Sequence, residues 1–294
     1  ITKWSLLLAR FGTGFFLAGI YPVGMKIAAD YYEKGLGKAL GFLVGALVLG
    51  TALPYIINGT VWGKNPGIVI VITSSLTIFG GILLYFLVPN GPFRKKSTHL
   101  KLSAGPQLFR TPNFKKAAFG YFGHMWELYA FWAFTPFAIN TFNILSASSL
   151  SVPLWTGIVI TLGSISCGIG GILSQRYGSK KVAFIALLIS GVCCIISPLL
   201  FQSSELLFLG GWCLWGMAVT ADSPQFSNLV ASSISPELKG TGLTLVNCIG
   251  FAITIASIQL LSTLSNVIES NYIFLILALG PIFGLWHLND HKSD

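Results

Sequence analysis

Two ionisable residues lie three positions apart inside one long apolar stretch, residues 114–140. They are His124 and Glu127, and this spacing places them on one face of a helix. Phe131 and Phe134 continue the same stripe and are candidates to line a ligand pocket. A carboxylate inside a membrane is costly and normally faces a wet cavity or a partner, which favours a role in moving solutes or protons. The alternative is a hydrogen-bonded pair that only holds two helices together.

Other polar residues interrupt the apolar segments nearer the C-terminus. Asp222 and Gln225 are three positions apart, so they share a helical face, and Pro224 between them predicts a kink. Asp222 is interpreted either as an inner gate or as a helix-packing residue. Asn247 is a candidate contact for a solute, although an interhelical hydrogen bond is the commoner role for such a residue.

Arg10 lies well inside the first apolar segment, at a depth close to that of Glu127 in its own segment. A lone buried arginine is costly, so we predict that Arg10 faces a cavity and forms an ion pair with Glu127. The alternative is that its long side chain extends to the lipid headgroups.

The composition bounds the class of protein. The chain of 294 residues is 53% hydrophobic and 9% charged, against about 25% charged in soluble domains. This indicates an integral membrane protein and argues against a soluble enzyme. The net charge of +9 does not indicate nucleic-acid binding, because the basic residues fall in short loops between apolar segments. All five cysteines lie inside apolar segments without metal-site spacing, so we expect reduced packing residues, no metal and no cofactor.

Nine segments are long and apolar enough to cross a membrane core of ~30 Å as helices, and none alternates as a spanning strand would. The fold class is therefore an all-α integral membrane protein with nine transmembrane helices. The segments are 4–29, 39–57, 68–88, 117–139, 155–173, 182–200, 206–229, 243–261 and 272–288.

The loop charges predict the orientation. Lys and Arg gather in alternate loops, and only Lys3 and Lys64 fall in loops on the opposite side. The basic loops and the C-terminus are therefore predicted to be cytoplasmic in a multi-pass plasma-membrane protein, or in the inner membrane if the cell is bacterial. The chain starts at Ile1 without a charged leader region, so we expect that its start is missing or that it is a fragment.

The longest loop suggests a division into domains. Residues 89–113 are basic and rich in Pro and Gly, and they separate three spans from six. We therefore expect three helices over 1–88, a cytoplasmic linker over 89–113 and a six-helix bundle over 114–294. A weak repeat supports this division, because Gly14 and Pro22 of the first span align with Gly216 and Pro224 of the seventh.

The turn after the fifth span has the sequence GILSQRYGSKK over residues 171–181. It resembles the cytoplasmic G-x-L-x-D-R-x-G-x-K/R-K/R loop of the major facilitator superfamily, with Gln175 in place of the acidic residue. The resemblance implies that the nine spans correspond to helices 4–12 of that family, with helices 1–3 absent. The residues that match or replace motif positions are Gly171, Gln175, Arg176, Gly178, Lys180 and Lys181.

Two further patterns bear on this resemblance. Arg10 and Gly14 resemble the R-x-x-x-G pattern on helix 4 of proton-coupled members, where the arginine is associated with substrate anions or proton handling. Gly41 and Gly45 permit close helix approach, but Ala46 stands where antiporter members have proline. We therefore expect helix packing at these glycines and leave symport or antiport open.

The resemblance implies secondary active transport of a small solute by alternating access, with Glu127 and His124 exchanging protons. Arg10 favours an organic or inorganic anion as the solute, and leaves a drug or a sugar open. The expected partners are a small molecule or ion, protons and the lipid bilayer, with no nucleic acid. A second hypothesis is a membrane sensor or assembly subunit that keeps the fold without transport. An intramembrane enzyme lacks support, because the sequence shows no nucleophile or second ligand cluster near the pair.

Overall fold

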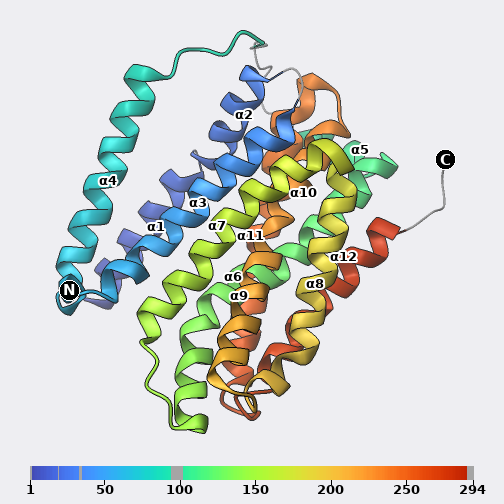
Figure 1. Ribbon diagram of the computed structural model, residues 1–294. Helices are drawn as coiled ribbons and strands as arrows, with labels where there is room; N and C mark the ends of the chain where they lie inside the picture. The colour runs from blue at the N-terminus through green and yellow to red at the C-terminus, as the bar shows by residue number, and fades with distance from the viewer. Residues whose placement is uncertain (1, 19, 33–34, 94–101, 290–294) are drawn as a thin grey trace.

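The computed structural model describes residues 2–18, 20–32, 35–93 and 102–289. These residues form helices and turns, and they include no strand. Figure 1 shows long helical rods lying side by side, with α4 (Pro66–Leu87) set apart along one edge. No residue of α4 is buried, so this helix offers most of its apolar surface to its surroundings.

Each predicted span is helical. By length and composition, six helical stretches of the described chain could cross a membrane: residues 36–58, 66–87, 152–177, 179–200, 205–232 and 239–264. The continuous helices are α3 (Leu36–Asn58), α4, α6 (Pro112–Ser146), α7 (Val152–Tyr177), α8 (Ser179–Leu200) and α11 (Lys239–Leu264). Three spans are built from two pieces: α1 (Lys3–Ala18) with α2 (Tyr21–Tyr31), α9 (Glu205–Ala221) with α10 (Ser223–Ser232), and η4 (Ile273–Ala278) with α12 (Leu279–Asn289). Short segments η1 (Val61–Lys64), η2 (Leu102–Ala104), α5 (Gly105–Leu108) and η3 (Pro236–Leu238) complete the chain.

Two of the broken spans break at equivalent positions of the predicted repeat. α10 begins at Ser223 with Pro224 in its first turn, and α2 begins at Tyr21 with Pro22 in its first turn. Proline fits the first turn of a helix because no backbone N–H is needed there, but it cannot continue a helix that precedes it. The helix is interrupted at Asp222, two residues before Pro224, although Asp222 keeps helical dihedral angles; the predicted kink itself stays a prediction.

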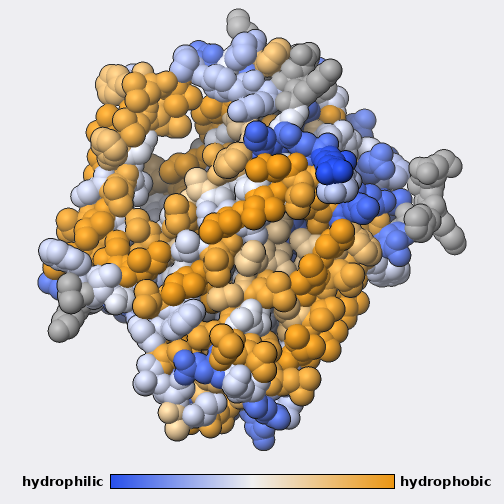
Figure 2. Space-filling model, viewed as in Figure 1, coloured by the Kyte–Doolittle hydropathy of each residue, from blue (hydrophilic) through white to orange (hydrophobic). Residues whose placement is uncertain are grey.

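Figure 2 shows hydrophobic surface over the middle of the molecule and hydrophilic surface gathered where α7 meets α8. Gly178 makes that turn with φ of 81°, a left-handed conformation that suits glycine, so the predicted tight turn is confirmed. We call this end of the molecule, with Arg176, Lys180 and Lys181 on its surface and Lys115 at the start of α6, the basic end.

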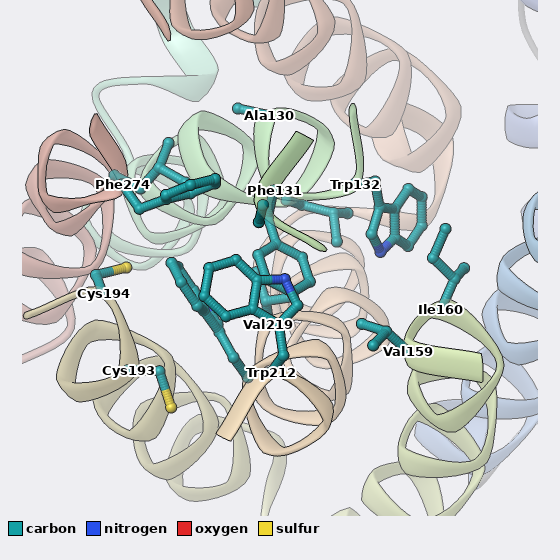
Figure 3. Packing of buried hydrophobic residues seen from close by; sticks show 14 of the residues in the cluster. Ala130, Phe131, Trp132, Val159, Ile160, Cys193, Cys194, Trp212, Val219 and Phe274 are labelled. Atoms are coloured by element: carbon teal, nitrogen blue, oxygen red, sulfur yellow. The ribbon is translucent and has the colours of Figure 1, made fainter. Parts of the chain in front are cut away.

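Aromatic side chains fill the interior of the last six spans. Trp212 lies at the centre, 6.0 Å from Phe131 and 5.1 Å from Phe274 between ring centroids. Figure 3 shows Cys194 and Phe274 on one side of Trp212, and Ile160 on the other. All five cysteines are free, as predicted.

The most extensive helix pairing in the molecule joins α3 to α7. A Cβ on Gly41 would lie 2.8 Å from the Cα of Gly171, and a Cβ on Gly45 would lie 2.9 Å from the carbonyl oxygen of Ser164. The Ser164 hydroxyl donates a hydrogen bond of 2.7 Å to the carbonyl oxygen of Gly45. The packing role predicted for these glycines is thus confirmed, and it joins the first three spans to the last six.

The predicted linker is partly described. Its residues 94–101 lie outside the described chain, while η2 and α5 pack against α11. The division of the chain into two membrane domains stays a prediction.

Candidate functional site

Glu127 lies at the middle of α6 and is fully buried. Its Oε1 accepts hydrogen bonds from the indole N–H of Trp215 at 2.6 Å and the thiol of Cys194 at 3.2 Å. Its Oε2 accepts a hydrogen bond of 3.0 Å from the hydroxyl of Ser190. An ionised carboxylate is purely an acceptor, so three converging donors form a pocket suited to it.

His124 lies one turn closer to the basic end on the same helix and faces Asp222. The Nδ1 of His124 and the Oδ1 of Asp222 are 2.8 Å apart, and both side chains are fully buried. This approach is not aligned for a hydrogen bond, so the contact is an electrostatic one. Among the described residues, the other histidine nitrogen and the other carboxylate oxygen have no hydrogen-bond partner either. The pair therefore keeps unused capacity to bind a proton or a polar ligand.

The break between α9 and α10 positions Asp222. The carbonyl oxygen of Asp222 accepts the bond from the Phe226 N–H that starts α10, while its side chain leaves the helix axis toward α6. The interruption is confined to Asp222, whose dihedral angles stay helical, so the span remains helical on both sides of it.

Two amides extend the polar region. Both amide atoms of Gln225, on α10, are buried without a hydrogen-bond partner among the described residues. Asn247, on α11, accepts a hydrogen bond of 2.7 Å from the hydroxyl of Tyr121, and its own NH₂ has no partner there. An unsatisfied buried polar group costs about 1–3 kcal/mol, so these amides are groups that a bound water or solute would satisfy.

A small cavity lies where α2 and α3 meet α6, α9, α10 and α11. Its volume is about 10 Å³, which is room for roughly one water molecule. Ser223, next to the helix break, forms part of its wall. The aromatic residues that line it are Tyr21, Tyr121, Tyr129, Trp132 and Phe251. Since Tyr121 also bonds Asn247, one side chain links this cavity to the Asn247 amide.

The predicted ion pair between Arg10 and Glu127 is wrong. Glu127 is enclosed by α8 and α9, where three donors already satisfy it, whereas Arg10 is exposed on α1. The depth of each residue in its span was not enough to predict the pairing, because the rotation of each helix decides which neighbour a side chain meets.

The two phenylalanines of the predicted stripe lie away from the central cavity. Phe131 packs against Trp215, with ring centroids 4.7 Å apart, and is part of the aromatic core. Phe134 is half-buried, and its ring centroid lies 5.9 Å from that of Phe137. In this structure both are packing residues.

A family model described as the Major Facilitator Superfamily matches residues 2–258. This chain belongs to the major facilitator superfamily. The predicted fold, an all-α membrane bundle of this superfamily, is confirmed by that match together with the helical architecture.

Solved structures of superfamily-type transporters share the fold. The human organic anion transporter MFSD10 (TETRAN) superimposes with a TM-score of 0.67 at 15% identity, covering 90% of this chain and 66% of that chain. A bacterial homologue of the iron transporter ferroportin in an outward-facing state gives a TM-score of 0.58 at 15% identity, covering 92% of this chain and 65% of that chain. The chain thus spans about two thirds of the length of these structures. No curated protein sequence matches it significantly.

Sequence reasoning missed two features of this superfamily member. It identified His124 and Asp222 separately but did not pair them, and it treated Cys194 as a packing residue. The only available signal was chemical: a buried carboxylate needs donors, and neighbouring spans carry Ser190 and Trp215 near mid-depth. Nothing in the spacing along the chain shows which of many such residues is the donor.

The indole of Trp215 offers a test of the Glu127 pocket. Trp215→Phe keeps an aromatic ring but removes the donor at 2.6 Å, so we expect a loss of about 1–3 kcal/mol in the free energy of unfolding. Thermal unfolding of the purified protein measures the loss. Trp286→Phe is the matched control, since Trp286 is 72% exposed and its replacement should have little effect. Equal stability of the two variants would show that the bond contributes nothing.

Proposed function

We propose that this chain forms part of a secondary active transporter that moves a small solute across the membrane by alternating access, coupled to protons. Membership of the superfamily supports membrane transport in general. The observation that carries the proton coupling is the group His124, Asp222 and Glu127, fully buried beside a broken span.

The charge balance of this group supports the proposal. It contains one histidine and two carboxylates, so with all three ionised it carries one net negative charge. Within a low-dielectric interior an unbalanced charge is costly, and uptake of one proton removes it. The His124 and Asp222 side chains are in contact, so we assign that proton to the group and not to one residue.

The arrangement of the spans supports alternating access. The central cavity lies between α2 and α3 on one side and helices of the last six spans on the other. Glycines at the α3–α7 contact let the two backbones approach closely, and Tyr21 adds a contact from α2. We propose that the two sets of helices rock about this contact, opening the cavity to one side of the membrane at a time.

An organic anion is the solute class that we propose to test first. Arg10 resembles the helix 4 arginine associated with anions, and one relative in fold is described as an organic anion transporter. Aromatic walls, and the Asn247 amide that Tyr121 links to the cavity, suit an organic solute with polar groups.

Uptake into proteoliposomes tests the proposal. The purified protein is reconstituted, an acid-outside gradient is imposed, and a panel of labelled organic anions, sugars and cationic drugs is added. We expect at least one solute to accumulate faster with the gradient than after a proton ionophore collapses it. Accumulation that is indifferent to the gradient would overturn the coupling. Absence of any flux would favour the sensor or assembly hypothesis.

A further inference from the structure

A groove lies on the outer surface of the last six spans, between α7, α8 and α9. Its volume is about 400 Å³, and its lining is almost entirely apolar. Several of its side chains are partly exposed, including Ile169, Leu173, Ile185, Ile189 and Leu214. The groove lies on the apolar face that a spanning bundle turns toward acyl chains, so hydrocarbon is the medium that it meets.

The groove ends in a cationic mouth at the basic end. Tyr177 and Lys181 line it there, and the Lys181 ammonium lies 5.7 Å from the centroid of the Tyr177 ring. The Arg176 guanidinium lies 5.3 Å from the same centroid. Among the described residues, no carboxylate lies within ion-pair distance of either cation. Gln175 leaves this turn without the acidic residue that would offset them.

We propose that this groove is a binding site for one anionic phospholipid. An acyl chain lies along the apolar groove, and the phosphate of the headgroup meets Arg176 and Lys181 at the mouth. The apolar groove and its cationic mouth match the two parts of a phospholipid. Basic side chains at the end of a span lie at headgroup level, and the middle of the span faces hydrocarbon. A solute of the central cavity is not a suitable occupant, because the groove lies outside the bundle.

The floor of the groove connects it to the helix break. Met217, Ala218 and Ala221 of α9 line it, and Ala221 directly precedes Asp222. A bound acyl chain therefore packs against the last turn of α9 and favours the conformation in which that turn is formed. Any effect of the lipid on transport rests on the proposed function, whereas the binding itself does not.

Native mass spectrometry of the purified protein tests the site directly. The protein is titrated with phosphatidylglycerol and with phosphatidylcholine of identical acyl chains. We expect the first phosphatidylglycerol to be retained at least about fivefold more strongly, because each nearby cation contributes about that factor toward an anionic headgroup. Lys181→Gln should reduce this preference about fivefold. Lys115→Gln, at the same end but outside the groove, should leave it unchanged.

A second pair of variants tests the acyl chain contact. Ile185→Trp fills the groove from an exposed position of α8, so it should displace the tightly held lipid without unfolding the protein. Ile195 is also exposed on the same helix but lies outside the groove, so Ile195→Trp should retain the lipid. Equal retention of the two lipids, or equal behaviour within either pair of variants, would overturn the proposal in favour of ordinary surface lipid. These outcomes are read without any transport assay, so they do not depend on the proposed function.

Discussion

The Asp222→Asn variant is expected to lose proton-driven uptake by on the order of 100-fold. Asparagine matches aspartate in shape but cannot take up a proton at its side chain, and it leaves His124 without a charged partner. Breaking a buried ion pair costs about 3 kcal/mol or more, which corresponds to about that factor in a rate or an equilibrium. The initial rate of uptake under an imposed proton gradient is the measurement.

A second measurement separates coupling from structural damage. Exchange of labelled for unlabelled solute across the proteoliposome membrane needs no net proton movement, so Asp222→Asn should retain it. Glu205→Gln is the matched control, because Glu205 begins the same span and its carboxylate accepts a solvent-exposed hydrogen bond from the Ser148 hydroxyl. Loss of exchange together with loss of thermal stability would show that Asp222 acts in packing alone.

The histidine can be tested by a double-mutant cycle. If His124 and Asp222 act as one unit, His124→Gln combined with Asp222→Asn should cost no more proton-driven uptake than Asp222→Asn alone. Additive losses would instead indicate two independent roles, and the proposed three-residue group would then be wrong.

The second large effect is expected at the contact between α3 and α7. Gly41→Val should destabilise the protein by about 1–3 kcal/mol and slow transport, since even a Cβ at this position would lie 2.8 Å from the Cys167 carbonyl oxygen and from the Gly171 Cα. Both neighbours are backbone atoms, so the helices must move apart. The close approach of α3 to α7 would then be lost, and the proposed rocking motion requires that approach in one of its two end conformations.

Gly50→Val is the matched control for this prediction. Gly50 lies on the same helix and has no atom within 4 Å of an added Cβ, so the same residue enters the same helix without a clash. Melting temperature and initial uptake rate should stay close to those of the unchanged protein. If the two variants behave alike, the glycine contact contributes neither stability nor motion.

Features encoded within one span could be predicted from the sequence. The spans follow from runs of about 20 apolar residues, the break before α10 from Pro224, and the turn between α7 and α8 from Gly178. Close helix approach at Gly41 was also predicted from local spacing, although its partner α7 was not. Spans, helix interruptions, tight turns and small-residue contacts each depend on backbone geometry and hydropathy, and both can be read from a short stretch of sequence.

Contacts between spans could not be predicted in the same way. His124 and Glu127 were correctly placed on the inner side of their helix, yet the choice of Arg10 as partner failed. Asp222 is the partner of His124, and Trp215 is a partner of Glu127. The rotation of each helix and its place in the bundle decide these pairings, and they depend on the packing of all the spans together. Hydropathy constrains depth along a span, but it does not constrain rotation about the helix axis.

The size of the central cavity has a consequence for any binding measurement. A space of about 10 Å³ cannot hold a solute of several heavy atoms, so the conformation described here excludes it. Only the fraction of molecules in which the walls have parted can bind, and the observed dissociation constant equals the intrinsic one divided by that fraction. Substitutions that loosen the walls, such as truncation of Tyr21 or Trp132, would then tighten apparent binding even though they remove contacts.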